Sequence, residues 1–423
     1  MPVSRDAQGQ LLLGTLPLRQ LVDDPRWATP FYAYDLEGIV ASATTLDNAF
    51  GRAPHLVCLA VKANTAGPIL EALSRLGLGA DVVSGAELSV ALRAGIPPER
   101  LVYSGVAKRD AEIDMAIGLG DRGILALQIE SLEEISRVAA RALAAGRTAR
   151  VSVRINPSVK RELLSTHDHI ATGHDEAKFG VPRDDVKEAV RRVREASALT
   201  LVGFNFHIGS QLTEVGGYRE SAALLCQIAQ DAIAGGCTSL EFLNTGGGFG
   251  IDYGSGCAAS PADFAGVVIS EFDRAKLSHL KMVVEPGRAL VGAHGVVVAR
   301  TVQTKVAGHC QWIMIDAGMN DLIRPALYQA RHRIVSIDDP KGPAASWVVV
   351  GPVCESSDDF GAHELPANAP RAVAILDAGA YGFTMASQYN GRALPDELFI
   401  SKGEVVSVLR GRTSAEWAAS RFC

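Results

Sequence analysis

Apolar and polar positions follow a repeating order over the first two-thirds of the chain. Short apolar runs rich in β-branched residues alternate with longer stretches in which apolar residues recur at helical spacing. Eight runs have the length and composition of buried strands, and they end at Val61–Lys62, Val83–Ser84, Tyr103–Ser104, Gln128–Glu130, Arg154–Asn156, Phe206–His207, Leu243–Asn244 and Val284–Glu285. The helical stretches between them include residues 68–76, 85–94, 132–145, 184–195, 218–234 and 262–276.

Eight strand–helix units predict an α/β fold, a (β/α)8 barrel of the TIM type over residues 30–287. Parallel strands that helices cover are apolar almost throughout, as these runs are. Polar residues and glycines gather where the strands end. In this fold the carboxyl ends of the strands form the active-site face, so we expect the chemistry there.

The longest interval between two strands runs from Asn156 to His207 and contains a polar insert at residues 160–178. We interpret the insert as a loop over the site. Its histidines, His167, His169 and His174, are a weaker candidate for a metal site, because their spacing is not that of a tight helical pair and no acidic partner is evident. We therefore expect no metal.

After residue 288 the pattern becomes strand-like, with only a short helical segment at 322–330. The strand-like runs lie at residues 296–306, 311–316, 334–338, 347–353, 372–377 and 405–410. They predict a second, mostly antiparallel β domain, a barrel or sandwich formed by residues 1–29 together with 288–423. A run at 11–16 precedes the first domain and could join its barrel.

Composition narrows the function classes. A chain of 423 residues with 48% hydrophobic and 21% charged residues can bury the cores of two domains. The net charge of -6 does not suit nucleic-acid binding. Apolar runs are too short for a transmembrane helix, and residues 1–10 have no apolar signal core. Seven cysteines without a CxxC pair argue against a disulfide framework, so we expect a reducing cytoplasm.

Lys62 is the first residue with candidate chemistry. It ends the first strand in the string AVKAN, so its side chain would point into the barrel mouth. Desolvation lowers the pKa of a lysine and frees its amine to form a Schiff base. A snorkelling or salt-bridged lysine is the alternative interpretation, and for Lys62 taken alone we favour it.

Two strand ends carry groups that suit a phosphate. Gly246, Gly247 and Gly248 follow the seventh strand, and successive glycines let backbone N–H groups close on a phosphate. Loops after strands seven and eight are the usual phosphate site of this barrel. Ser210, in HIGSQ after the sixth strand, can reach the same group. A plain flexible turn is the alternative for the glycines, but their position favours phosphate binding.

Two further strand ends carry groups that suit an aromatic nitrogen ring. Glu285 ends the eighth strand in EPGR, where it could pair with Arg288 or hold a protonated pyridine nitrogen. A protonated ring is a strong electron sink, which a carbanion-forming reaction needs. The imidazole of His207 can stack on such a ring. A lone histidine is more often a satisfied core residue, but a barrel strand end favours function.

Two loops of the predicted β domain hold three more candidates. Cys354 and Glu355 follow a strand in GPVCES, where the thiol is either inert packing or a proton donor. Tyr381 lies between glycines in GAYG, and it either packs an interface or binds phosphate.

Arg324 and Tyr328 are four residues apart in a segment that is predicted to be helical. Residues at this spacing face the same side of a helix, so the two side chains can grip one carboxylate. An exposed arginine is the alternative.

These motifs, in this order, resemble the fold-type III pyridoxal-phosphate decarboxylases, and among them the diaminopimelate decarboxylase family. The resemblance runs from about Pro30 to Glu397. The matching strings are AVKAN, GADVVSGAEL, RINP, THDHIATG, KFG, HIGSQ, GGGFG, EPGR, DAGMNDLIRPALY, GPVCES, GAYG and SQYNGR. Each string alone is weak, whereas their joint occurrence is highly specific.

The resemblance implies a cofactor, pyridoxal 5′-phosphate, held by Lys62 through a Schiff base. His207 would stack on its ring and Glu285 would bind its pyridine nitrogen. The implied phosphate contacts are Ser210, Gly247, the backbone of Gly287 and Arg288, and Tyr381. The implied substrate contacts are Arg288, Arg324 and Tyr328 for the distal carboxylate, Glu355 for the distal ammonium, and Tyr381, with Cys354 as the proton donor.

The implied reaction is the decarboxylation of meso-2,6-diaminopimelate to L-lysine, the last step of lysine biosynthesis. Similar enzymes are homodimers in which Cys354 and Glu355 enter the neighbour's barrel, so the partners expected are an amino-acid substrate and a second copy of the chain. Related decarboxylases for ornithine, lysine, a carboxylated polyamine or a siderophore or antibiotic precursor are the main alternative. Glu285 argues against a racemase on the same barrel, and the second domain argues against a vitamin-binding barrel without catalysis.

Overall fold

The computed structural model describes residues 3–158, 173, 177–254, 259–338 and 342–422. The chain divides into two compact units. One unit comprises Ser42–Ile251 and Cys257–Ala289, and we call it the barrel unit. The other comprises Met1–Ala41, Asp252–Gly256 and Leu290–Cys423, and we call it the β unit. The chain therefore passes between the units four times, at 41/42, 251/252, 256/257 and 289/290.

The barrel unit is a closed parallel barrel of eight strands, which confirms the predicted fold class. Its strands are β5 (His55–Ala60), β6 (Gly79–Val82), β7 (Leu101–Tyr103), β8 (Ala126–Ile129), β9 (Ala149–Asn156), β11 (Leu199–Asn205), β12 (Phe242–Asn244) and β13 (Lys281–Val284). Pairing of β8 with β9 and of β13 with β5 closes the ring. A two-residue strand, β10 (Val181–Pro182), pairs in parallel with the carboxyl end of β9.

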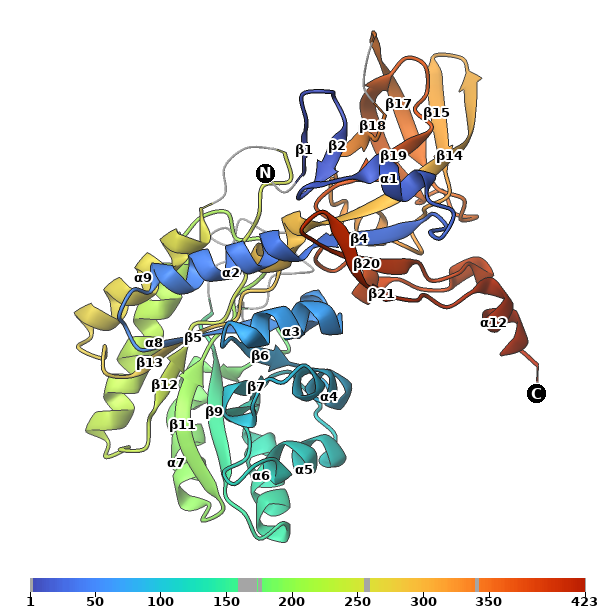
Figure 1. Cartoon of the computed structure of the whole chain (residues 1–423). Coiled ribbons are helices and arrows are strands. Elements are labelled where there is room, and N and C mark those ends of the chain that lie inside the picture. The colour runs from blue at the N-terminus through green and yellow to red at the C-terminus, as the bar shows by residue number, and fades with distance from the viewer. Residues whose placement is uncertain (1–2, 159–172, 174–176, 255–258, 339–341, 423) are drawn as a thin grey trace. The chain divides into compact units, whose positions relative to one another are not determined.

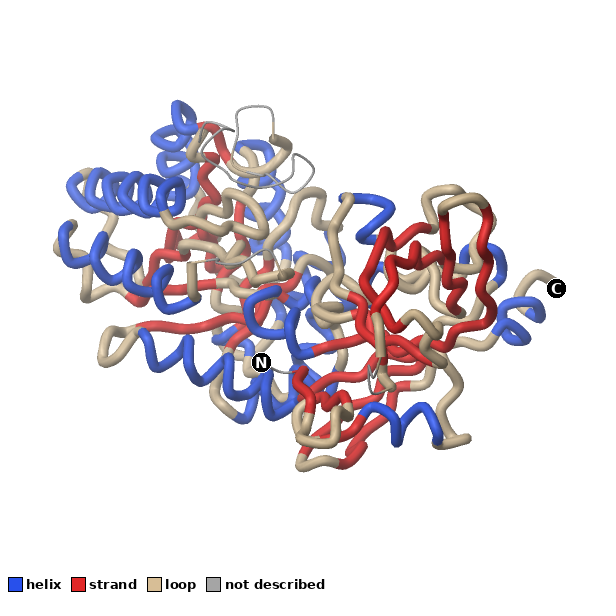
Figure 2. Tube along the Cα trace, turned by 90° about the horizontal axis from the view of Figure 1, so that it is seen from above, coloured by secondary structure: helices blue, strands red, loops and turns tan. Residues whose placement is uncertain are grey.

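Helices surround the barrel strands, as Figures 1 and 2 show. They are α3 (Gly67–Arg75), α4 (Gly85–Arg93), α5 (Asp110–Gly118), α6 (Leu132–Ala144), α7 (Val186–Glu195), α8 (Gly216–Ala234) and α9 (Pro261–Arg274). Serine caps fix where several begin. Ser84 accepts a hydrogen bond from the backbone of Glu87 at the start of α4, and Ser260 forms a capping box with Asp263 at the start of α9.

The β unit contains a nine-stranded mixed sheet. Its strands are β4 (Phe31–Asp35), β14 (Gly295–Ala307), β15 (Cys310–Ile315), β16 (Ile334–Ser336), β17 (Ala344–Val350), β18 (Asp359–Pro366), β19 (Ala372–Ile375), β20 (Asp396–Ser401) and β21 (Glu404–Leu409). Most pairs are antiparallel, as predicted, but β15 with β17 and β4 with β20 are parallel. The unit also contains the short helices α11 (Arg324–Tyr328) and α12 (Ser414–Ala419).

The N-terminal run at 11–16 does not join the barrel. It forms β2 (Leu11–Leu13) and the start of β3 (Leu16–Pro17), which pair with each other in a small sheet beside β1 (Val3–Arg5). Gly14 between them has a left-handed backbone with φ of 59°, which lets the run turn back on itself. The helix α1 (Leu18–Asp23) follows, and its apolar face belongs to the core of the β unit.

The barrel begins later than residue 30. The strand β4 pairs with β14 and β20, both in the β unit, and the first barrel strand is β5. Between them runs α2 (Leu36–Ala49), which the division into units cuts at Ala41. The apolar residues of β4 are completely buried, so their hydrophobicity does not distinguish a barrel strand from a strand of the other sheet.

Candidate active site

Lys62 lies at the carboxyl end of β5, in a single 3-10 turn that spans Val61–Ala63. Its Nζ atom is 2.8 Å from Oδ2 of Asp81, the third residue of β6. The side chain of Asp81 is completely buried, whereas that of Lys62 is 36% exposed. The amine is therefore anchored from within the barrel and still accessible, so the salt-bridged and the functional interpretations of Lys62 do not exclude each other.

Glu285 follows β13 and is buried. Its Oε1 atom accepts hydrogen bonds from Gln128 Nε2 at 2.9 Å and from Asn244 Nδ2 at 2.5 Å. Burial and the charge of Asp81 raise the pKa of the carboxyl to about 8, although Lys62 and the bond from Asn244 act in the opposite direction. A carboxyl of this kind can share a proton with a basic ring nitrogen.

His207 follows β11 and meets the glycine loop. The backbone N–H of Gly247 donates to its Nδ1 at 3.3 Å, so this nitrogen is the acceptor. Desolvation, together with the charges of Lys62 and Arg154, lowers the pKa of His207 well below its ordinary value. The ring is therefore a neutral imidazole, which is suited to packing against an aromatic ring.

The three glycines permit close backbone packing at the strand ends. Gly246 and Gly248 have left-handed backbones, with φ of 66° and 91°. At Gly247, a Cβ atom would overlap the carbonyl group of Glu285. The backbone N–H of Glu285 also donates to the carbonyl of Gly246 at 2.7 Å. The loop is thereby fixed on the end of β13, and it is not a loosely held turn.

Ser210, Gly287 and Arg288 lie at the same end of the barrel. Arg288 Nη2 donates to Ser210 Oγ at 3.0 Å, and the loop of Ser210 is joined to the glycine loop by a bond from Leu212 N–H to the carbonyl of Gly248 at 2.8 Å. At Gly287, a Cβ atom would lie 2.8 Å from that of Ala63, in the turn of Lys62. A guanidinium, a hydroxyl and a glycine loop so gathered have the chemistry of a phosphate site.

Arg324 and Tyr328 begin and end α11 in the β unit, as the predicted helix requires. Arg324 is buried, and its Nη1 donates to the hydroxyl of Tyr253 at 2.7 Å. Its Nη1 also lies 3.5 Å from Nε2 of His332. His332 Nδ1 donates to the carbonyl of Leu376 at 2.9 Å, which leaves Nε2 to accept. The guanidinium is therefore buried and oriented, and the alternative of an exposed arginine is wrong.

Cys354 and Glu355 lie in the loop between β17 and β18, and both are exposed. The side chain of Cys354 is an exposed free thiol, so its interpretation as inert buried packing is wrong. Neighbours in the β unit hold this loop: the Cys354 N–H donates to Asn390 Oδ1 at 2.9 Å, and the Tyr389 hydroxyl donates to Glu355 Oε1 at 2.6 Å. Buried Asp358 anchors the end of the loop by accepting from the Val353 N–H at 2.6 Å.

Tyr381 is partly buried and has a left-handed backbone with φ of 55°. The preceding segment is fixed by Asp377, which forms a bidentate ion pair with Arg333 at 2.8 to 3.0 Å. The N–H of Gly379 donates to the carbonyl of Gly292 at 2.9 Å. The position of Tyr381 is thus set by its strand-end loop.

Several polar residues beside the candidates were not singled out from the sequence. Asp81, Gln128 and Asn244 each interrupt an apolar strand with a buried polar side chain, and that interruption was a usable signal. Tyr253 and Asn390 gave no such signal, because their contacts depend on the folding of distant segments.

The histidines His167, His169 and His174 lie outside the described residues. In the part of the chain that the structure describes, no cluster of three or more His, Cys, Asp or Glu side chains could hold a metal ion. The backbone N–H of Gly180 donates to Glu130 Oε2 at 2.9 Å, and Glu130 forms an ion pair with Arg154 at 2.9 Å.

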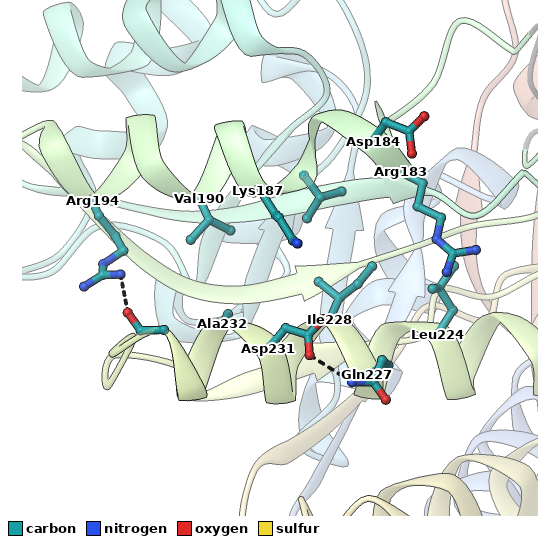
Figure 3. A pocket seen from close by; sticks show the side chains of 12 residues that line it. Arg183, Asp184, Lys187, Val190, Arg194, Leu224, Gln227, Ile228, Asp231 and Ala232 are labelled. Carbon is teal, nitrogen blue, oxygen red and sulfur yellow. Dashed lines mark hydrogen bonds between the residues drawn. The ribbon is translucent and has the colours of Figure 1, made fainter.

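A cavity of about 550 Å³ lies on the outside of the barrel, between α7 and α8 (Figure 3). Val190, Leu224 and Ile228 line its apolar part, and Arg183 and Asp184 lie at one end. None of the predicted site residues lines this cavity, so it does not belong to the candidate active site.

A family model for the pyridoxal-dependent decarboxylases, covering their pyridoxal-binding domain, matches residues 36–292. This stretch is more than half of the chain and includes all eight barrel strands. The chain belongs to the pyridoxal-dependent decarboxylases. Its cofactor is accordingly pyridoxal phosphate.

Relatives that match nearly the whole chain indicate one family within this class of enzymes. The diaminopimelate decarboxylase of Helicobacter pylori is 39% identical over 392 residues, which are 92% of this chain and 94% of that protein. The enzyme of Aquifex aeolicus is 35% identical over 415 residues, 97% of this chain and 94% of that protein. The crystal structure of the M. jannaschii enzyme with L-lysine has a TM-score of 0.92 at 32% identity, covering 100% of this chain and 98% of that one. Within its class, the chain belongs to the diaminopimelate decarboxylase family.

The residues of the barrel unit fit pyridoxal phosphate. An accessible amine, a neutral imidazole and a buried carboxyl are collected at one end of the barrel, which suits an aldehyde-bearing pyridine ring. The cradle of Gly246 to Gly248, with Ser210 and Arg288, suits the phosphate. None of the described helices is long and apolar enough to span a membrane.

Proposed function

We propose that this protein converts meso-2,6-diaminopimelate to L-lysine and carbon dioxide, as the last step of lysine biosynthesis. The observation that carries the proposal is the buried guanidinium of Arg324, held by Tyr253 and His332. An oriented guanidinium suits a carboxylate, which can accept two parallel hydrogen bonds. Meso-diaminopimelate has a carboxylate at its distal end, whereas lysine and ornithine do not. Membership of the family and the lysine complex of a relative support the same reaction.

Residues of the barrel unit would hold the cofactor. Lys62 would bind its aldehyde carbon covalently, His207 would pack on its ring, and Glu285 would face its pyridine nitrogen. Ser210, the glycine loop and the backbone of Gly287 and Arg288 would surround its phosphate, together with Tyr381 of the β unit. When bound, pyridoxal phosphate supplies an electron sink for the pair of electrons that the departing carboxylate leaves at the α-carbon.

Residues of the β unit would select the substrate and return the proton. Arg324 and Tyr328, with Arg288 of the barrel unit, would bind the distal carboxylate. Glu355 would bind the distal ammonium, with Tyr381 also in contact. Cys354 would donate the proton of its Sγ to the α-carbon after carbon dioxide has left. Its exposed, free thiol and the bond from its backbone to Asn390 support this role.

Two subunits would share each active site. We propose a homodimer in which Cys354 and Glu355 of one chain complete the barrel site of the other. Support comes from the exposure of both side chains, which suits groups that act on a partner. We also expect a cytoplasmic location, and the five cysteines in the described part of the chain, all of them free, agree with a reducing compartment.

A substrate screen tests the function. Protein loaded with pyridoxal phosphate is offered meso-diaminopimelate, L-lysine and L-ornithine, and carbon dioxide release is measured for each. We expect kcat/KM for meso-diaminopimelate to exceed that for lysine by up to ~10⁴-fold, because lysine has no distal carboxylate to accept hydrogen bonds from the buried guanidinium. A preference for lysine or ornithine would identify a sister decarboxylase.

A further inference from the structure

We propose that Gln128 and Asn244 are positioning residues that hold Glu285 by one carboxyl oxygen and leave the other for the ring nitrogen of the cofactor. The inference rests on the role proposed above for Glu285. Neither amide takes part in the reaction itself. Their role follows from the buried hydrogen bonds that they form inside the barrel.

Both amides bind the same oxygen atom. Gln128 Nε2 and Asn244 Nδ2 donate to Oε1 of Glu285, at 2.9 and 2.5 Å. No donor to Oε2 comes from the described residues. A carboxylate saturated on one side and open on the other has a defined direction for its remaining hydrogen bond.

The orientation of each amide is itself fixed. The Oδ1 atom of Asn244 accepts from the backbone of Gly246 at 2.8 Å, so its Nδ2 must face Glu285. The Oε1 atom of Gln128 accepts from Asn205 Nδ2 at 2.6 Å, and Ser104 Oγ lies 2.9 Å from the same atom. Exchanging the nitrogen and oxygen of either amide would place two donors, or two acceptors, against each other.

The same network reaches Lys62. The hydroxyl of Ser104 also lies within hydrogen-bonding distance of Asp81 Oδ1, while Oδ2 of Asp81 holds Lys62. Because the hydroxyl has one hydrogen, it serves Asp81 or Gln128 at any moment, and Asn205 is the constant donor to Gln128. The amine and the carboxyl are thus positioned by one buried array.

Neutral amides suit this position better than a cation would. A lysine or arginine against Glu285 would neutralise the carboxylate and leave the ring nitrogen without a counter-charge. Amide donors stabilise the ionised carboxyl and leave its charge for a protonated ring. The ionisable groups that face Glu285 are Asp81, Lys62 and Arg154, with the Cys58 thiol and the Tyr218 phenol. Of these, Asp81 opposes ionisation, so the amide donors are needed.

The test uses the variant Gln128→Met, which keeps the side-chain length and removes both the donor and the acceptor. The matched control is Gln230→Met, since Gln230 Nε2 bonds to the carbonyl of Ala275 on the outer surface. Each protein is loaded with cofactor labelled with nitrogen-15 in the ring, and the ring nitrogen signal is followed by NMR between pH 6 and 9. The dissociation constant of the cofactor is measured in parallel.

In the wild type and in Gln230→Met we expect a protonated ring nitrogen over most of this range. In Gln128→Met the nitrogen should lose its proton at lower pH, and cofactor binding should weaken by about tenfold, as expected for one lost hydrogen bond to a charged group. A signal that titrates in Gln128→Met as in the wild type would overturn the proposal, and so would an unprotonated ring in the wild type.

A second variant, Gln128→Glu, keeps the proposal testable if Gln128→Met does not fold. Its protonated carboxyl can still donate to Glu285, whereas its ionised form repels it. We therefore expect nearly normal ring protonation at the acidic end of the range and a loss at the basic end. A pH-independent defect would indicate a merely structural role and contradict the proposal. These readouts need no substrate, so they are independent of whether meso-diaminopimelate is turned over.

Discussion

Lys62 and Asp81 form an ion pair across two neighbouring barrel strands, with 2.8 Å between Nζ and Oδ2. The carboxylate is completely buried and the lysine is partly exposed. The lysine is therefore held by its charged end at the mouth of the barrel, with its amine where a ligand can reach it. This relationship explains how one side chain can be both part of the fold and available for chemistry.

The ion pair predicts a measurable coupling in stability. Lys62→Met leaves the buried Asp81 without its cation, so the free energy of unfolding of the cofactor-free protein should fall. Because the lysine is partly exposed, we expect a loss of roughly 1–2 kcal/mol, less than for a fully buried pair. The double variant Lys62→Met/Asp81→Asn should recover part of this loss. Urea denaturation of the wild type, Lys62→Met, Asp81→Asn and the double variant measures this coupling, and strictly additive losses would show that the pair contributes nothing.

The buried carboxyl of Glu285 predicts a pH-dependent stability of the cofactor-free protein. Its pKa of about 8 lies well above the ordinary value of a glutamate carboxyl, so the folded state keeps a proton that the unfolded chain releases. The contribution is complete below about pH 4.5 and is lost as the pH rises through 8, by roughly 5 kcal/mol in total. Glu285→Gln should remove this slope. Denaturation at several pH values compares the two proteins, and equal slopes would refute the raised pKa.

Arg324 predicts the substrate preference. Arg324→Ala should lower kcat/KM for meso-diaminopimelate by about 10²-fold or more, because it removes charged hydrogen bonds to the distal carboxylate. Residual turnover of lysine should change far less, and covalent binding of the cofactor should persist. Steady-state kinetics with both substrates measure the effect. An equal loss for both would mean that Arg324 does not bind the distal carboxylate.

Shared active sites predict complementation between inactive chains. Lys62→Ala and Cys354→Ala should each be inactive alone. After subunit exchange, half of the dimers are hybrids and each hybrid has one intact site, so activity should return to about a quarter of the wild-type value. Native mass spectrometry of chains with different tags confirms exchange. Hybrids that form without activity would place each site within one chain.

The sequence predicted the eight barrel strands because their apolar runs are continuous and their ends are polar. It did not predict β18 (Asp359–Pro366) or β20 (Asp396–Ser401). In β18, exposed and buried residues alternate, so its apolar content is low. Helix α2 (Leu36–Ala49) was also not predicted, because its apolar residues are mixed with threonine and serine.

The candidate site was predictable in its strand-end residues and not in their supports. Lys62, His207 and Glu285 each follow an apolar run, which makes them visible along the chain. The bond from Gln128 to Glu285 joins residues 157 apart in sequence, and that from Arg324 to Tyr253 joins residues 71 apart. Such contacts exist only once the fold has formed, so the local pattern can mark Gln128 as a polar residue in an apolar strand but cannot reveal its partner.

The attachment point of the cofactor is the most direct test of the account. The loaded protein is reduced with borohydride, digested and mapped by mass spectrometry, which locates the pyridoxyl group on a particular lysine. We predict one group per chain, on the peptide that contains Lys62, and none in Lys62→Ala. A pyridoxyl group on another lysine of the wild type, or an unchanged label in Lys62→Ala, would contradict the site described here.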